Sequence, residues 1–123
     1  MATVADVMTR DILTVARSAT LGQVARELRT RNVGSALVVD EAQSPIGIIT
    51  ERELVDSVAA SRNPDAGMAE SWMKADPTTV EASASLTDAS ALMRLHNVRH
   101  LPVTDGGKLV GIISMRDLLA GTL

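Results

Sequence analysis

The chain of 123 residues carries one sequence pattern twice, and this repeat limits the possible folds more than any other feature. Aligning Met8 with Met73 brings identical residues together along most of both halves. The matching pairs are Asp11 and Asp76, Val15 and Val80, Leu21 and Leu86, Asn32 and Asn97, Val38 and Val103, Asp40 and Asp105, and, after one deleted position, Gly47 and Gly111, Ile49 and Ile113, Arg52 and Arg116, and Leu54 and Leu118. The deletion falls where a turn is expected, so it supports the alignment.

The first copy predicts a strand, a helix, a hairpin and a second helix. The β-branched run Ile12–Val15 favours a strand. Thr20 is a candidate N-cap, and apolar residues follow it at the spacing of an amphipathic helix: Leu21, Val24, Ala25 and Leu28. Apolar runs at 36–39 and 46–49 around a polar turn at 41–45 predict a hairpin, and a helix follows from Thr50.

The second copy predicts the same order. Ser85 is its N-cap and Asp88 stands at the capping-box position, ahead of the stripe formed by Leu86, Ala89 and Met93. The hairpin runs from 101–104 through Asp105-Gly106-Gly107 to 109–113, because Asp-Gly is a strong turn signal. A final helix begins at Ser114.

We therefore predict an α/β (α+β) fold of two tandem βαββα units. The predicted divisions are 1–60 for the first unit, 61–69 for a linker and 70–123 for the second unit. Strands such as Ile46–Ile49 are apolar on both faces, so we expect the two copies to cover each other as one domain.

Composition excludes several classes of function. The net charge of −3 and a single aromatic residue argue against nucleic-acid binding. The absence of cysteine excludes disulfides and thiolate sites, and two histidines give no metal constellation. Without a signal-peptide core or an apolar run long enough to span a bilayer, we expect a cytoplasmic protein with no membrane partner.

The parts found twice resemble cystathionine-β-synthase (CBS) domains. The resemblance rests on a Met near the start of each copy, on Leu101-Pro102-Val103 with Asp105, and on Gly111-Ile112-Ile113-Ser114-Met115-Arg116-Asp117. Two such copies resemble a CBS pair, or Bateman module, over about residues 4–119. The resemblance implies a pseudo-twofold pair whose clefts bind adenosine-containing ligands: AMP, ADP, ATP or S-adenosylmethionine.

Ser114 and Asp117 are the main candidate ligand residues. Ser-x-x-Asp at a helix start is a capping arrangement, and this is one interpretation. The resemblance implies a second role compatible with the first, in which the carboxylate accepts both ribose hydroxyls. In the first copy Thr50 and Glu53 take these places. Because Glu is one methylene longer, we expect the cleft of Thr50 and Glu53, with Thr78, to be the weaker one.

Arg99 and His100 precede the Leu-Pro-Val strand and are candidate phosphate ligands, with Arg116 assisting. A polar strand entry and a solvated arginine are the structural alternatives. The resemblance implies that the adenine slot is lined from the other copy. The matching positions are Ile12, Leu13, Ser35 and Ala36. Close packing between the copies is the alternative role of these positions.

The leading functional hypothesis is a regulatory nucleotide sensor that forms a homodimer and acts on a separate protein. It requires no cofactor; the nucleotide is a regulatory ligand. The second hypothesis is a ligand-free dimerisation or interaction module, and an S-adenosylmethionine binder is a variant of the first. An enzyme is not expected, since no nucleophile with a base and no phosphate-binding glycine loop is present.

Overall fold

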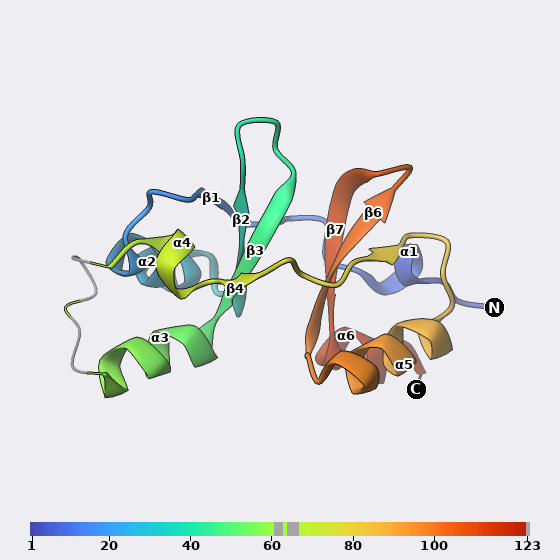
Figure 1. The fold of residues 1–123 in the computed structure, drawn as a ribbon. Coiled ribbons are helices and arrows are strands. Elements are labelled where there is room, and N and C mark those ends of the chain that lie inside the picture. The colour runs from blue at the N-terminus through green and yellow to red at the C-terminus, as the bar shows by residue number, and fades with distance from the viewer. Residues whose placement is uncertain (61–62, 64–66, 123) are drawn as a thin grey trace. The chain divides into compact units, whose positions relative to one another are not determined.

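The computed structural model describes residues 1–60, 63 and 67–122, which form two compact units. One unit is Leu13–Pro77, which we call the first-copy unit. The other combines Met1–Ile12 with Thr78–Leu123 and is the second-copy unit. Figure 1 shows the helices and strands of both. No helix within the described ranges has the length and apolar character needed to cross a membrane.

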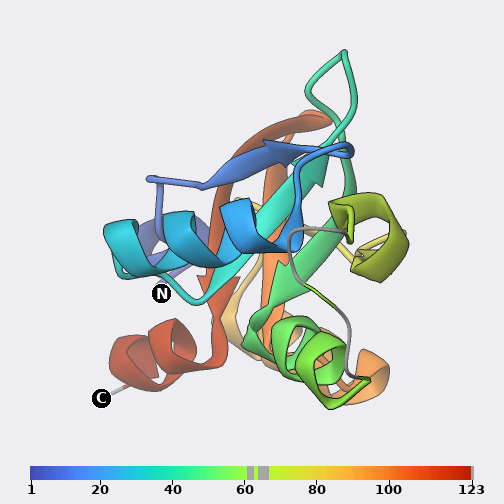
Figure 2. The same ribbon diagram turned by 90° about the vertical axis from the view of Figure 1, so that its left-hand side faces the viewer.

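The first-copy unit contains a four-stranded sheet in the order β1-β2-β3-β4. Its elements are β1 (Thr14–Ala16), α2 (Leu21–Arg31), β2 (Ser35–Val39), β3 (Pro45–Thr50), α3 (Glu51–Ala59), α4 (Ala69–Trp72) and β4 (Lys74–Ala75). β1 runs parallel to β2, while β3 is antiparallel to both of its neighbours β2 and β4. Figure 2 turns this unit toward the viewer and shows the β2–β3 hairpin extending beyond its helices.

The second-copy unit contains a three-stranded sheet in the order β5-β6-β7. Its elements are α1 (Val4–Val7), β5 (Val80–Glu81), α5 (Leu86–His96), β6 (His100–Asp105), β7 (Lys108–Ser114) and α6 (Met115–Thr122). The predicted order of strand, helix, strand, strand and helix is confirmed in each copy, and so is the mixed α/β class.

Each unit has its own apolar core. In the first-copy unit, α2 packs its stripe on alternate residues of the sheet, and Leu21, Val24, Val38 and Ile49 are all fully buried. In the second-copy unit the equivalent core is formed by Val4, Leu86, Ala89, Met93, Leu101, Val103, Ile113 and Leu118. All five residues of β2 are buried, as the apolar runs predicted.

Helices α2 and α5 begin where the sequence predicts. The Thr20 hydroxyl accepts a hydrogen bond from the Gln23 backbone amide at 3.1 Å, and the Thr20 backbone amide donates to Oε1 of Gln23 at 2.8 Å. Ser85 caps α5 by accepting from the Asp88 amide at 3.0 Å. Among the described residues, the reciprocal bond of a capping box, from the Ser85 amide to the Asp88 side chain, is not formed. Asn32 and Asn97 end the two helices in the left-handed conformation.

The first segment of each copy packs in the unit of the other copy. The amide of Ala5 donates to the Ala82 carbonyl, and that of Glu70 donates to the Arg17 carbonyl. Helix α1, at the start of the first copy, thus belongs to the second-copy unit, while α4 belongs to the first-copy unit. Ionised Asp6 accepts hydrogen bonds from the Thr3 amide and hydroxyl, which lowers the pKa of Asp6.

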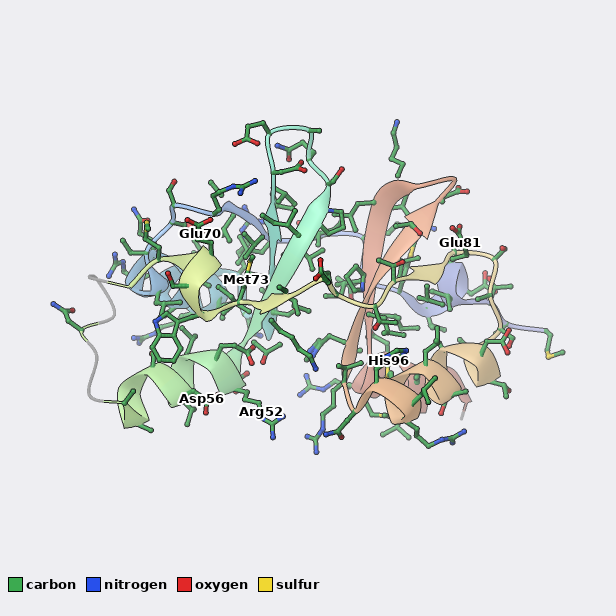
Figure 3. The ribbon with its side chains drawn as sticks, in the orientation of Figure 1. Arg52, Asp56, Glu70, Met73, Glu81 and His96 are labelled. Atoms are coloured by element: carbon green, nitrogen blue, oxygen red, sulfur yellow. The ribbon has the colours of Figure 1, made fainter. Side chains whose placement is uncertain are left out.

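Glycine residues in β3 and β7 leave room for these exchanged segments. A Cβ added to Gly111 would lie 2.6 Å from the Met8 sulfur and 2.9 Å from the Thr9 carbonyl oxygen. A Cβ added to Gly47 would overlap the side chain of Met73. Figure 3 shows Met73 against β3. The repeated Met and Gly positions are thus one packing contact made twice.

Some sequence expectations were wrong in detail. β1 begins at Thr14 rather than Ile12, so only its second half lies in the ladder. The tight turn of the second hairpin is Gly106-Gly107, with φ of 59° and 84°, and Asp105 still pairs with Lys108. Two consecutive positive φ values fit a type I′ turn. α1, α4 and β4 were not predicted. Most of the predicted 61–69 linker lies outside the described residues.

Candidate functional site

Five predicted ligand residues lie at one end of the β6–β7 hairpin in the second-copy unit. His100 begins β6 and pairs with Ser114, the last residue of β7. The Met115 amide donates to the Arg99 carbonyl at 2.9 Å, which holds the entry to β6 beside the start of α6. Arg116 and Asp117 follow in the first turn of that helix. The hairpin register therefore brings Arg99, His100, Ser114, Arg116 and Asp117 together.

Asp117 and Ser114 cap α6 without using all of their hydrogen-bonding capacity. Oδ2 of Asp117 accepts from the Ser114 amide at 2.9 Å, and Oγ of Ser114 accepts from the Asp117 amide at 3.2 Å. In the described part of the chain, Oδ1 of Asp117 and the hydroxyl hydrogen of Ser114 have no partner. Both residues are half-buried. The capping role and a ligand-binding role are therefore compatible.

The charges around this cap are basic. Arg99 and Arg116 are exposed, and no ion pair involves either of them within the described residues. His100 is half-buried beside them. α5 ends nearby in sequence with Arg94 and His96, and Figure 3 labels His96 on that helix. Planar guanidinium groups without carboxylate partners are suited to phosphate.

In the equivalent cap of the first-copy unit, the threonine hydroxyl donates to the acidic side chain. Ser35 begins β2 and pairs with Thr50, as His100 pairs with Ser114. Oε1 of Glu53 accepts from both the amide and the hydroxyl of Thr50, each at 2.7 Å. The Thr50 oxygen also accepts from the Arg52 amide at 3.3 Å. The hydroxyl hydrogen that is unused in Ser114 is therefore engaged in Thr50.

The candidate adenine residues divide between the two units. Leu13, Ser35 and Ala36 lie together in the first-copy unit, because the Leu37 amide donates to the Leu13 carbonyl at 2.9 Å. All three are buried. Ile12 is the last residue of the exchanged N-terminal segment, and Thr78 opens the second part of the same unit; both are half-buried.

One cavity of the first-copy unit lies away from these caps. It has a volume of about 310 Å³ and is lined at the ends of β1 and β2 by Thr14, Val15, Ala16, Arg17, Ser18, Val39, Asp40, Glu41 and Gln43. None of these residues was a candidate from the sequence. Within the described ranges, no group of three or more His, Cys, Asp or Glu side chains is placed to hold a metal ion.

Comparison with known proteins identifies both copies. The family model described as CBS domain matches residues 4–60 and 69–121. An uncharacterized protein of Methanopyrus kandleri is 39% identical over 118 residues, which are 94% of this chain and 60% of that relative. The chain therefore spans less than two thirds of this relative.

Two solved structures have the same fold over almost the whole chain. One is a CBS-domain protein from Burkholderia ambifaria, with a TM-score of 0.93, 36% identity, and coverage of 99% of this chain and 94% of that one. The other is a CBS domain protein from Pyrobaculum aerophilum complexed with AMP, with a TM-score of 0.87, 30% identity, and coverage of 94% and 89%.

Proposed function

The chain belongs to the CBS domain family as a tandem pair, and from this premise we propose that it is a regulatory module that binds an adenine nucleotide at Ser114 and Asp117. The observation that carries the proposal is the half-used cap of α6. One oxygen of the Asp117 carboxylate and the hydrogen of the Ser114 hydroxyl remain available for a ligand. They lie at the end of the β6–β7 hairpin, beside Arg99 and Arg116.

The chemistry of this end of the hairpin fits a nucleoside phosphate. A carboxylate accepts hydrogen bonds from the two ribose hydroxyls, and each such charge-assisted bond contributes about 1.5–3 kcal/mol. Arg99 and Arg116 supply positive charge for phosphate, and His100 can supply a ring N–H donor. The AMP complex of the Pyrobaculum aerophilum relative supports the same ligand class. Ile12, Leu13, Ser35 and Ala36 remain the residues predicted to receive the adenine.

The two copies are proposed to differ in affinity. Oε1 of Glu53 already accepts the Thr50 hydroxyl, so this hydroxyl would have to give up a 2.7 Å hydrogen bond before it could donate to a ligand at this cap. No equivalent bond opposes a ribose at Ser114. We therefore assign the main site to Ser114, Asp117, Arg99, His100 and Arg116, and a weaker one to Thr50, Glu53 and Thr78.

Exposed apolar side chains on the helices support a homodimer. Val55 and Val58 on α3 are each 65% exposed, Leu95 on α5 is 77% exposed and Leu119 on α6 is 60% exposed. A second copy that covers them would remove this apolar surface from water. A ligand would then act by shifting the equilibrium between two packing states that a regulated protein recognises.

Thermal unfolding with AMP, ADP, ATP and S-adenosylmethionine tests the proposal. A ligand present at about 100 times its dissociation constant stabilises the folded state by about 2.7 kcal/mol, which raises Tm by several degrees at this chain length. Asp117→Ala should remove most of the rise, and Glu53→Ala much less. Equal losses would contradict the difference between the copies.

The second candidate is a ligand-free interaction module, which the exposed apolar helix faces also favour. Purified protein that dimerises tightly, carries no nucleotide and shows no rise in Tm with any of the four ligands at millimolar concentration would favour it. An S-adenosylmethionine binder would instead respond to that ligand alone. Mass spectrometry of small molecules released from the purified protein separates these outcomes.

A further inference from the structure

A second binding site is indicated by the cavity at the opposite end of the first-copy sheet. Ser35 pairs with Thr50 at one end of the β2–β3 ladder, and Val39 pairs with Pro45 at the other. At about 3.3 Å per residue, the two ends are about 13 Å apart. The cavity at Val39 is thus separate from the Thr50 and Glu53 cap, and its role is independent of the nucleotide proposal.

The cavity has an apolar floor and a charged rim. Val39, which is 7% exposed, and Ala16, its partner in the β1–β2 ladder, form this floor, while the rim carries Arg17 from the loop after β1 and Asp40 and Glu41 from the β2–β3 turn. A volume of about 310 Å³ is at the lower limit for ligand pockets, so the occupant must be small.

Arg17 is held between two carboxylates but bonded directly to neither. Its guanidinium nitrogens lie 3.8 Å from Oε2 of Glu41 and 3.8 Å from Oε2 of Glu70. Figure 3 shows Glu70 reaching from α4 toward β1. Both separations exceed hydrogen-bond length, and exposed pairs of this kind contribute about 0–1 kcal/mol. A ligand can therefore replace these contacts with direct hydrogen bonds at little cost.

The turn opposite Arg17 is rigid. Oδ1 of Asp40 accepts from the amides of Ala42 and Ser44 at 2.9 and 3.0 Å, which leaves Oδ2 without a partner among the described residues. Glu41 is 90% exposed, and Arg17 is its partner among the described residues. The Asp40 carboxylate is thus positioned by the backbone, and the carboxylates of Asp40 and Glu41 are both available to a cation.

The repeat supplies an internal control that separates fold from function. In the second-copy unit, the positions equivalent to Arg17, Glu41 and Glu70 are Ala82, Gly106 and Ala5. The backbone frame is the same, because the Ala5 amide donates to the Ala82 carbonyl as the Glu70 amide donates to the Arg17 carbonyl. The fold therefore forms without these three charges, which occur together in the first-copy unit and are absent from the second-copy unit.

We propose that this cavity binds a small zwitterion, a free amino acid with an apolar side chain. Its carboxylate would bind the Arg17 guanidinium, its ammonium group would bind Asp40 and Glu41, and its side chain would lie on Ala16 and Val39. A simple anion is disfavoured by the surrounding carboxylates, and a simple cation by Arg17. The zwitterion satisfies both charges at once.

Titration of the ¹⁵N-labelled protein with L-leucine tests the proposal by NMR. The amides of residues 16–18 and 40–44 should shift with half-saturation at or below about 1 mM. N-acetyl-L-leucine lacks the ammonium group and L-leucinamide lacks the carboxylate, so each should bind at least about tenfold more weakly, equivalent to about 1.4 kcal/mol. Equal responses to the three compounds would overturn the zwitterion assignment.

Matched variants locate the site. Arg17→Ala should abolish the response, while Arg29→Ala, an exposed arginine on α2 outside the cavity, should preserve it. Glu41→Gln changes a side chain that is 90% exposed, so the fold is preserved while ammonium binding weakens. The proposal is overturned by absence of shifts up to about 10 mM, by shifts confined to other residues, or by a full response in Arg17→Ala.

Discussion

The hydroxyl of Thr50 donates to Oε1 of Glu53 at 2.7 Å, and this bond distinguishes the cap of Thr50 and Glu53 from the cap of Ser114 and Asp117. Ser114 makes no such bond to Asp117, although the backbone register around both pairs is the same. The hydroxyl at the cap is therefore engaged where the acidic residue is the longer Glu53, and available where it is the shorter Asp117.

Exchanging the two acidic residues should exchange the behaviour of the caps. Glu53→Asp shortens the carboxylate and frees the Thr50 hydroxyl, so nucleotide bound per chain, measured by equilibrium dialysis, should rise. Asp117→Glu should weaken nucleotide binding about tenfold, or 1.4 kcal/mol. Asp88→Glu is the control, because Asp88 holds the same helix position in α5. If Glu53→Asp changes nothing, the engaged hydroxyl is not what limits that cap.

A charge on the exposed face of α3 should separate the proposed dimer. Val58→Glu places a carboxylate at a position that is 65% exposed in the single chain. Its charge is tolerated in water and costly in an apolar interface, so the variant should sediment as a monomer. Ala42→Glu, in the exposed β2–β3 turn, should leave the sedimentation unchanged. A wild-type protein that sediments as a monomer at all concentrations would exclude the dimer.

Gly111→Ala should lower the free energy of unfolding by about 1–3 kcal/mol, the usual cost of overpacking. Its Cβ would meet the Thr9 carbonyl oxygen, which cannot move freely because Thr9 and Ile112 exchange two backbone hydrogen bonds at 2.8 and 2.9 Å. Gly47→Ala should cost less, since its Cβ meets only the flexible Met73 side chain. Urea unfolding followed by circular dichroism measures both. The reverse order would mean that Met packing, not the backbone, limits the space.

Thr20→Ala should destabilise the chain by about 1 kcal/mol, because the hydroxyl that accepts from the Gln23 amide is lost. Thr30→Ala is the matched control in the same helix. Thr30 is exposed and inside α2, where alanine favours the helix slightly, so stability should be unchanged or slightly higher. Urea midpoints of the two variants distinguish capping from a general effect of losing threonine.

Local signals were sufficient for most of the fold. Thr20, Ser85 and the apolar stripes determine where α2 and α5 begin and which face they bury, and these depend on neighbours in sequence. The short helices α1 and α4 were missed because four residues hold too little periodicity for detection. The repeated Met8 and Met73 were noticed, but their contacts with Gly111 and Gly47 depend on packing between distant segments.

The candidate site divides in the same way. Ser114 and Asp117 could be found because a cap is a local motif, and the register that adds Arg99 and His100 follows from the hairpin. The bond from Thr50 to Glu53 could not be predicted, since it depends on the rotamers of both side chains. The cavity at Arg17 was missed because its lining comes from two segments, 14–18 and 39–43, that are separated in sequence.

The exchange of first segments between the copies has a consequence for dissection of the gene. One repeat, cut from the chain at the repeat boundary, carries a first segment whose packing site is in the other repeat. A single repeat could complete the fold only by exchanging that segment with a second molecule. Joined in one chain, the two repeats supply each other's first segment, and this shared frame holds although their charges differ.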